Sequence, residues 1–174
     1  MIIWTEGDGR CAFRAFSKQI NEGAPLRERA EVQQADQYRK DMLDAMSTEA
    51  VRAYLEHTQE MELDAGVSFA HNMDARILRM TPPDEYAELP EVIALSIALK
   101  RKILVLHFRD LPGRRRRREE VDYTKEYDED DFVSMLFFEP QSALPGDCIR
   151  LFHHLPEVHF SAMRLVTTAG APFA

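Results

Sequence analysis

The amino-acid sequence predicts an α+β protein, and two patterns along the chain support that prediction. From residue 11 to about residue 100, apolar side chains recur at helical spacing among charged ones, and proline, serine or threonine residues mark the breaks. From residue 102 onward the apolar runs are short and rich in β-branched and aromatic residues, which favours strands. A block of helices followed by a block of strands is typical of one sheet packed against helices.

Five helices are expected in the first block. The first begins at Cys11, Pro25 precedes the second, and Ser47 or Thr48 can cap the third through its hydroxyl. Pro90 suits the first turn of the fifth helix, which is apolar on so much of its surface that it should be the central buried helix. The expected ranges are 11–21, 26–46, 48–63, 66–80 and 91–100.

Four strands are expected in the second block, over residues 102–108, 132–138, 148–153 and 158–166. The long segment 109–131 between the first two contains the five consecutive arginines Arg114–Arg118, followed by acidic residues. A solvated loop whose charges partly neutralise one another is the main interpretation of this segment. The alternative is a loop that flanks the substrate.

Composition limits the class of protein. A chain of 174 residues with 45% hydrophobic residues suits one domain, expected over residues 1–166, with residues 167–174 as a tail or linker stub. The two cysteines lie far apart, which gives neither a disulfide framework nor a metal motif and fits a reducing, cytoplasmic compartment. No segment is typical of a signal peptide or a membrane span. We therefore expect no membrane partner.

The net charge of −8 argues against nucleic acid as a partner, because the phosphate backbone favours basic surfaces. Such a charge suits a basic partner, although it is also what keeps many domains soluble. Both interpretations are open from the sequence.

The segment Gly7-Asp8-Gly9-Arg10-Cys11 combines a tight turn with a cysteine at the start of a helix. The free amides of a helix N-terminus carry partial positive charge, which favours a thiolate there. The turn can adopt positive φ at glycine, and its amides can face a developing oxyanion. Cys11 is therefore the predicted nucleophile, with Gly9 and Arg10 in the oxyanion turn. The alternative is a glycine turn followed by a cysteine that is only buried.

A nucleophilic cysteine needs an imidazole that accepts its proton. His159 lies in the last predicted strand, and an early cysteine with a distant downstream histidine is the order of papain-like peptidases. His154 is a weaker candidate, because Leu155-Pro156 predicts a turn there. Trp4 is expected to pack beside the turn that carries Cys11, or else to line the cleft.

Three blocks, in order along almost the whole chain, match the motifs of one family. The first fits a D-G-x-C-x-F-R pattern, the second an aromatic residue followed by a helix and an I-x-V strand, and the third two short strands with a histidine. In this sequence they are Asp8–Ser17; Tyr86 with Glu91–Ser96 and Ile103–Val105; and Ile149–Phe152 with His159–Met163. The chain resembles the OTU (ovarian tumour) domains, papain-like cysteine proteases that remove ubiquitin.

The resemblance implies a small, mostly antiparallel sheet packed between helices, with the cysteine helix against the sheet. It also implies a deubiquitinase that uses Cys11 and His159 to hydrolyse the bond after the C-terminal glycine of ubiquitin, with Asp8 bracing the turn. No metal or organic cofactor is implied. The expected partner is ubiquitin, polyubiquitin or a ubiquitin-like modifier, and the expected state is a monomer. The alternatives are an inactive OTU-fold module that binds ubiquitin, and a papain-like hydrolase for another tail.

One position departs from the family pattern. OTU domains usually carry Asp or Asn two residues after the histidine, where it orients the ring, and this chain has Ser161. Ser161 and Glu157 both lie two residues from His159 and therefore on the same face of the strand. We treat Glu157 and Ser161 as equal candidates for the orienting residue, with Glu6 behind them. The compact domain would suit a viral protein or a bacterial effector in a host cytosol.

Overall fold

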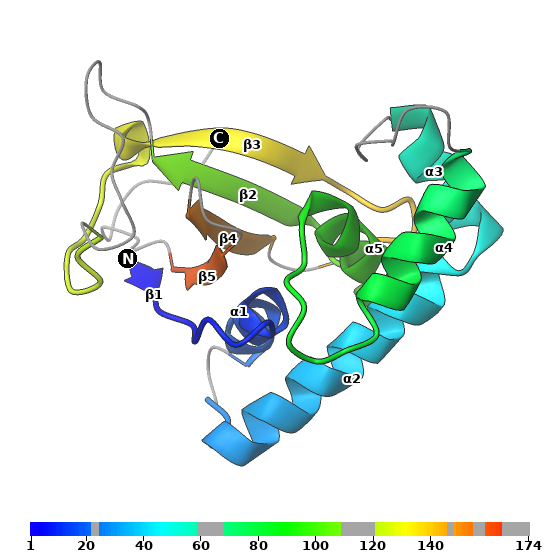
Figure 1. Cartoon of the computed structure of the whole chain (residues 1–174). Coiled ribbons are helices and arrows are strands. Elements are labelled where there is room, and N and C mark those ends of the chain that lie inside the picture. The colour runs from blue at the N-terminus through cyan, green and yellow to red at the C-terminus, as the bar shows by residue number, and fades with distance from the viewer. Residues whose placement is uncertain (22–24, 59–67, 109–120, 146–147, 155–158, 165–174) are drawn as a thin grey trace.

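Figure 1 shows the computed structural model of the chain, which describes residues 1–21, 25–58, 68–108, 121–145, 148–154 and 159–164. Its helices confirm the five expected segments, although α3 is described only to Thr58. They are α1 (Cys11–Ile20), α2 (Glu28–Met46), α3 (Glu49–Thr58), α4 (Phe69–Arg79) and α5 (Leu89–Leu99).

The described strands form one five-stranded sheet in the order β1-β5-β4-β2-β3. Only β2 and β4 pair in parallel, and the other pairs are antiparallel. The strands are β1 (Ile2–Ile3), β2 (Ile103–Phe108), β3 (Phe132–Phe138), β4 (Ile149–His154) and β5 (His159–Met163). The α+β class with a mostly antiparallel sheet is confirmed. β1 was not predicted, since two residues are too few to form a recognisable pattern.

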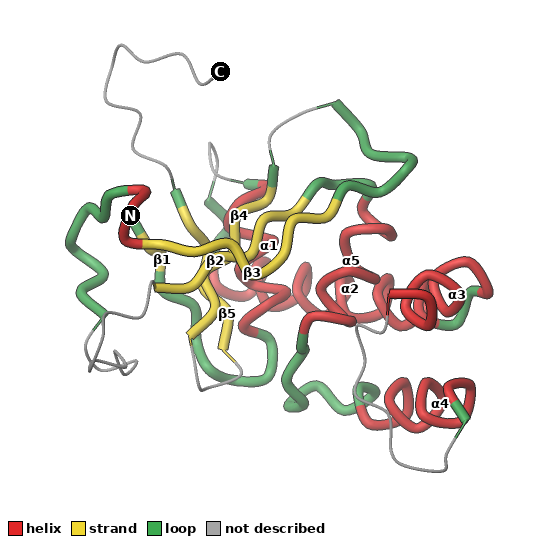
Figure 2. The backbone as a smooth tube through the Cα atoms, turned by 90° about the horizontal axis from the view of Figure 1, so that it is seen from above, coloured by secondary structure: helices red, strands yellow, loops and turns green. Residues whose placement is uncertain are grey.

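The two faces of the sheet are covered differently. On one face α1 packs against β5 and β4, and α2 lies outside α1 and α5 (Figures 1 and 2). On the other face, residues of segment 121–131 pack on Ile2, Phe152 and Met163, and Val121 of this segment is buried there. In the part of the chain that the structure describes, this second face is therefore covered by segment 121–131, which contains one 3₁₀ turn, and not by a layer of α-helices.

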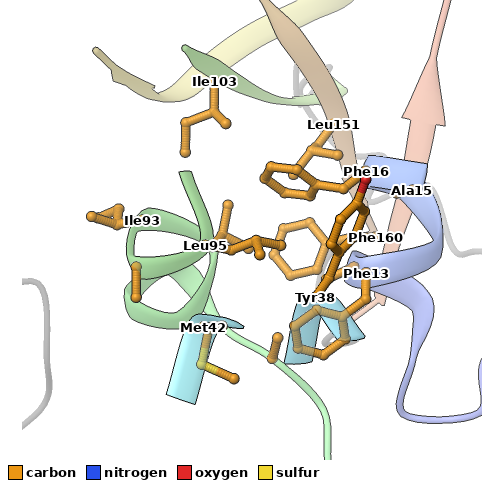
Figure 3. Close-up of a cluster of buried hydrophobic side chains, with 14 of the residues drawn as sticks. Phe13, Ala15, Phe16, Tyr38, Met42, Ile93, Leu95, Ile103, Leu151 and Phe160 are labelled. Atoms are coloured by element: carbon orange, nitrogen blue, oxygen red, sulfur yellow. The ribbon is translucent and has the colours of Figure 1, made fainter. Parts of the chain in front are cut away.

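The core beneath the sheet fixes the position of α1. Phe13 and Phe16 are fully buried, and Figure 3 shows them gathered with Leu95 of α5 and Phe160 of β5. Burying such a side chain stabilises the fold by about 1.5–3 kcal/mol. The helix that begins at Cys11 is therefore held by its apolar face against the sheet and α5.

The helix α5 is the central buried helix, as predicted. Its N-terminus carries a capping box. The side chain of Glu88 accepts the backbone amide of Glu91, and the side chain of Glu91 accepts that of Glu88. Arg76 of α4 donates to both carboxylates, and these contacts raise its pKa above the ordinary value despite the opposing effect of burial. The buried Glu91 is thus a structural residue.

Several sequence predictions lie outside the described residues. These are the arginines Arg114–Arg118, the candidate Glu157 and the expected tail 167–174. Among the helices that are described, none has the length and apolar character needed to cross a membrane.

Candidate active site

The turn before α1 is braced by the carboxylate of Asp8. Its Oδ1 accepts the amide of Arg10 at 3.1 Å, and its Oδ2 pairs with Arg14 of α1 at 3.0 Å. Arg14 also pairs with Glu6 at 3.1 Å and with Glu31 of α2 at 3.1 Å. Asp8 therefore ties the turn to the helix that follows it.

The same turn is fastened to the segment before α5. Arg39 of α2 donates to the carbonyl oxygens of Gly9 at 2.8 Å and Glu85 at 2.7 Å, and it also reaches those of Met80 and Pro83. Gly9 has φ of 76°, and a Cβ atom there would lie 2.4 Å from the backbone of Asp84. Only glycine fits at this position. Tyr86 closes the contact by donating to the carbonyl of Gly7 at 2.7 Å.

The thiol of Cys11 is buried at the first turn of α1, with 0% of the residue exposed. Burial raises the pKa of the thiol above its ordinary value and Asp8 adds to the rise, while backbone hydrogen bonds at Phe160 and Ala12 lower it. The net direction is opposite to the expectation from the helix N-terminus, because loss of water outweighs the stabilising amides. The helix that begins at Cys11 packs on β5, the strand that begins at His159.

His159 begins β5 directly opposite His154 of β4. Both side chains are buried, and their ring centroids lie 4.8 Å apart. The hydroxyl of Ser161 lies between them, 3.0 Å from Nε2 of His154 and 3.5 Å from Nε2 of His159. Ser161 thus contacts the imidazole as the sequence analysis allowed. His154 is the last residue of β4, one position beyond the expected end of that strand, and the turn expected at Leu155-Pro156 lies outside the described residues.

Aromatic rings cover this histidine pair. Trp4 stacks on His159 with centroids 4.9 Å apart and planes 28° from parallel, and it is 36% exposed. Tyr123 packs against the edge of Trp4 at 5.1 Å and lies 6.1 Å from the ring of His154. Trp4 therefore packs over His159 itself, and it separates the buried ring from solvent.

The three candidates for the orienting residue fare differently. Ser161 is within reach of His159. Glu6 is paired with Arg14 and has a largely exposed side chain, so its observed contact braces the turn. Glu157 lies outside the described residues. Arg10 belongs to the predicted turn, but its amide donates to Asp8, which leaves the amides of Gly9 and Cys11 as candidate oxyanion donors.

Sequence reasoning missed parts of this site. Arg39 appeared only as one charged residue on a helix, and no short motif marks an arginine that binds carbonyl oxygens 30 to 46 positions away. Tyr123 comes from the segment that was interpreted as a solvated loop. A signal for His154 did exist, since two strands joined by a short connection bring their adjoining ends together.

No family model matches this sequence, and no curated protein matches it either. Solved structures do match the fold. The OTU domain protease of Taggert virus superposes with a TM-score of 0.56 at 14% identity, covering 93% of this chain and 77% of that one. The fold is that of OTU domains.

Two further OTU structures were solved with ubiquitin bound. The OTU of Hazara virus has a TM-score of 0.54 at 16% identity and covers 97% of this chain and 82% of that one. An OTU deubiquitinase from Wolbachia pipientis has a TM-score of 0.53 at 12% identity, with 93% of each chain covered. At these identities the likeness establishes the OTU-like, papain-type fold.

Proposed function

We propose that this chain is a cysteine-type deubiquitinase of the OTU family, acting in a reducing compartment such as the cytosol. The observation that carries the proposal is the position of Cys11. It begins the helix that packs on β5, the strand whose first residue is His159. The OTU-like fold, which two structures solved with bound ubiquitin share, supports ubiquitin as the proposed substrate.

In the first half-reaction, His159 accepts the thiol proton of Cys11 as the sulfur attacks the carbonyl carbon of the terminal glycine of ubiquitin. Since Ser161 contacts Nε2, the atom that accepts this proton is Nδ1. The tetrahedral oxyanion is stabilised by amides of the turn, and the amide of a first helical residue such as Cys11 has no acceptor within its own helix. His159 then protonates the departing lysine amine, which leaves a thioester.

In the second half-reaction, His159 removes a proton from water, which attacks the thioester. The C–S bond breaks, ubiquitin leaves with a carboxylate, and the thiol recovers its proton. A pKa raised by burial means that the resting thiol is protonated. Proton transfer to His159 therefore accompanies substrate binding and attack, rather than preceding them.

The proposal is tested with ubiquitin that carries an electrophile at its C-terminus. We expect the protein to gain the mass of one ubiquitin, because only an activated thiol at the tail site reacts with this probe. Cys11→Ala should remove the adduct. The measurement is intact mass after reaction, with circular dichroism to show that the variant is folded.

Cys148→Ala is the matched control, since Cys148 is the second cysteine and is half-buried immediately before β4. It should form the adduct as the wild type does. An adduct that survives in Cys11→Ala, or none in the folded wild type, would contradict the proposed function. Reaction with a different modifier carrying the same electrophile would point to another ubiquitin-like tail.

The burial of Cys11 favours a second candidate, an OTU-fold module that binds ubiquitin without cleaving it. A thiol with no exposed surface and a raised pKa is a poor nucleophile until the site opens. The presence of Ser161 where OTU domains usually carry Asp or Asn also favours this candidate. This candidate predicts measurable ubiquitin binding by calorimetry, with no adduct and slow alkylation of Cys11.

A further inference from the structure

We propose that His154 is a positioning residue for this active site, and that it acts on His159 through the hydroxyl of Ser161. The inference rests on the proposed function. The three side chains form a relay of two imidazoles with one hydroxyl between them, in a place where a single carboxylate or amide would be simpler. The relay supplies what Ser161 alone lacks, which is a fixed direction for its proton.

The arrangement is built into the sheet. His154 and His159 are directly paired residues of β4 and β5, and Ser161 follows two positions later on the same face. All three are buried, with 3%, 1% and 0% of the residue exposed. Phe152 and Trp4 pack their rings against the pair, at 4.7 Å from His154 and 4.9 Å from His159. In such surroundings each hydrogen bond has a strong influence on proton position.

The proton positions follow from the roles. To accept a proton at Nδ1, neutral His159 must carry its own proton on Nε2, so this nitrogen donates to Ser161. A hydroxyl has only one proton to donate. That proton then goes to Nε2 of His154, 3.0 Å away, which must be the unprotonated nitrogen of its ring. The order of donation is therefore His159 to Ser161 to His154.

Loss of His154 would remove the acceptor for the hydroxyl proton. Ser161 could then donate to Nε2 of His159 and stabilise the tautomer with its proton on Nδ1. That tautomer cannot accept the thiol proton, and choice of tautomer is the role that the third residue plays in such sites. The contact between Ser161 and His159, at 3.5 Å, is the longer of the two links in the relay.

The test measures kcat and KM on a fluorogenic ubiquitin amide for single and double variants. We expect His154→Phe to lower kcat roughly 10- to 100-fold with little change in KM, the size of effect that one hydrogen bond to a charged group produces. His154→Gln should recover most of the loss, because its amide oxygen can accept near the position of Nε2. His154→Asn, whose amide lies near Nδ1 instead, should not.

The decisive comparison is the double variant. If His154 acts only through Ser161, His154→Phe should cost nothing further in a Ser161→Ala background. His153→Phe is the matched control, since His153 is the neighbouring residue of β4, lies on its other face and stacks on Phe160. It should keep wild-type kcat. Additive losses, or equal activities for the Gln and Asn variants, would overturn the relay.

A second readout separates this proposal from the proposed function. Alkylation of Cys11 by iodoacetamide depends on thiolate formation and needs no ubiquitin. The relay predicts the same order of rates, with wild type and His154→Gln ahead of His154→Phe and His154→Asn. If ubiquitin is not a substrate, this order still supports the relay. If ubiquitin is cleaved but the order fails, the relay is wrong and the deubiquitinase stands.

Discussion

Gly9 shows how one residue holds the candidate active site in place. It combines a positive φ with a carbonyl bound by Arg39 and a backbone pressed against Asp84. Its neighbours are Asp8, whose carboxylate braces the turn, and Arg10, which directly precedes Cys11. A change at Gly9 therefore acts on the site through the backbone rather than through the side chains of Cys11 or His159.

Gly9→Ala is expected to lower the free energy of unfolding by at least about 1–2 kcal/mol from backbone strain alone. The added Cβ would also meet Asp84 at 2.4 Å, so the turn must shift and probe reactivity should fall steeply. Urea denaturation and adduct formation measure the two effects. Gly7→Ala, at an exposed glycine that lacks the positive φ of Gly9, should leave stability nearly unchanged. Equal effects of the two variants would refute this explanation.

At this scale the sequence predicted which residues form the turn but not the electrostatics of the thiol. Cys11 at a helix start was expected to have a lowered pKa, and its burial reverses the direction. Burial of a given side chain depends on what the rest of the chain places over it. Likewise Ser161 could be placed near His159 from strand periodicity, whereas its contact with His154 required the register between two strands.

At the scale of elements, β4 carries adjacent histidines on its two faces with different environments. His154 belongs to the proposed relay. His153 stacks on Phe160 with centroids 4.7 Å apart on the helix side. Burial, with a smaller contribution from His107, lowers the pKa of His153 from 6.5 to about 4. Protonation of His153 therefore opposes folding.

The sign of the resulting pH dependence follows from linkage. Between pH 6.5 and about 4 the unfolded chain binds a proton at this residue and the folded chain does not, so stability is full above pH 6.5 and falls as the pH is lowered. The loss amounts to at most about 3 kcal/mol. His153→Phe should flatten this part of the stability curve and match the wild type at pH 8. The measurement is the free energy of unfolding from urea denaturation across this pH range. If it falls as steeply with pH in His153→Phe as in the wild type, the interpretation is wrong.

Helices were easier to predict than their contacts. The periodic segments and the capping residues before α5 mark where helices form, and these rules are local. The two-residue β1 has no local signal and exists because Ile2 and Ile3 find Met163 and Ala162 as partners. The cover over the second face of the sheet was also missed, since segment 121–131 is mostly charged and its few apolar residues show no period.

For the molecule as a whole, the charge of −8 makes a prediction about association. If acidic surface attracts the arginines of the ubiquitin tail, adduct formation should slow several-fold between about 50 mM and about 500 mM NaCl. Alkylation of Cys11 by neutral iodoacetamide should not change. Measuring both rates across this series separates attraction from a general salt effect. If adduct formation and alkylation depend equally on salt, the negative charge serves only solubility.

The order of strands in the sheet has a consequence for synthesis of the protein. Ile2 pairs with Met163, and the amino group of Met1 donates to the carbonyl of Arg164 at 2.8 Å. Contacts of such long sequence separation form late in folding. While the ribosome is still producing β4 and β5, the emerging polypeptide carries Cys11 without the histidines that would serve it. Under the proposed function, the thiol of a chain assembled in this way stays inert until β5 has been translated.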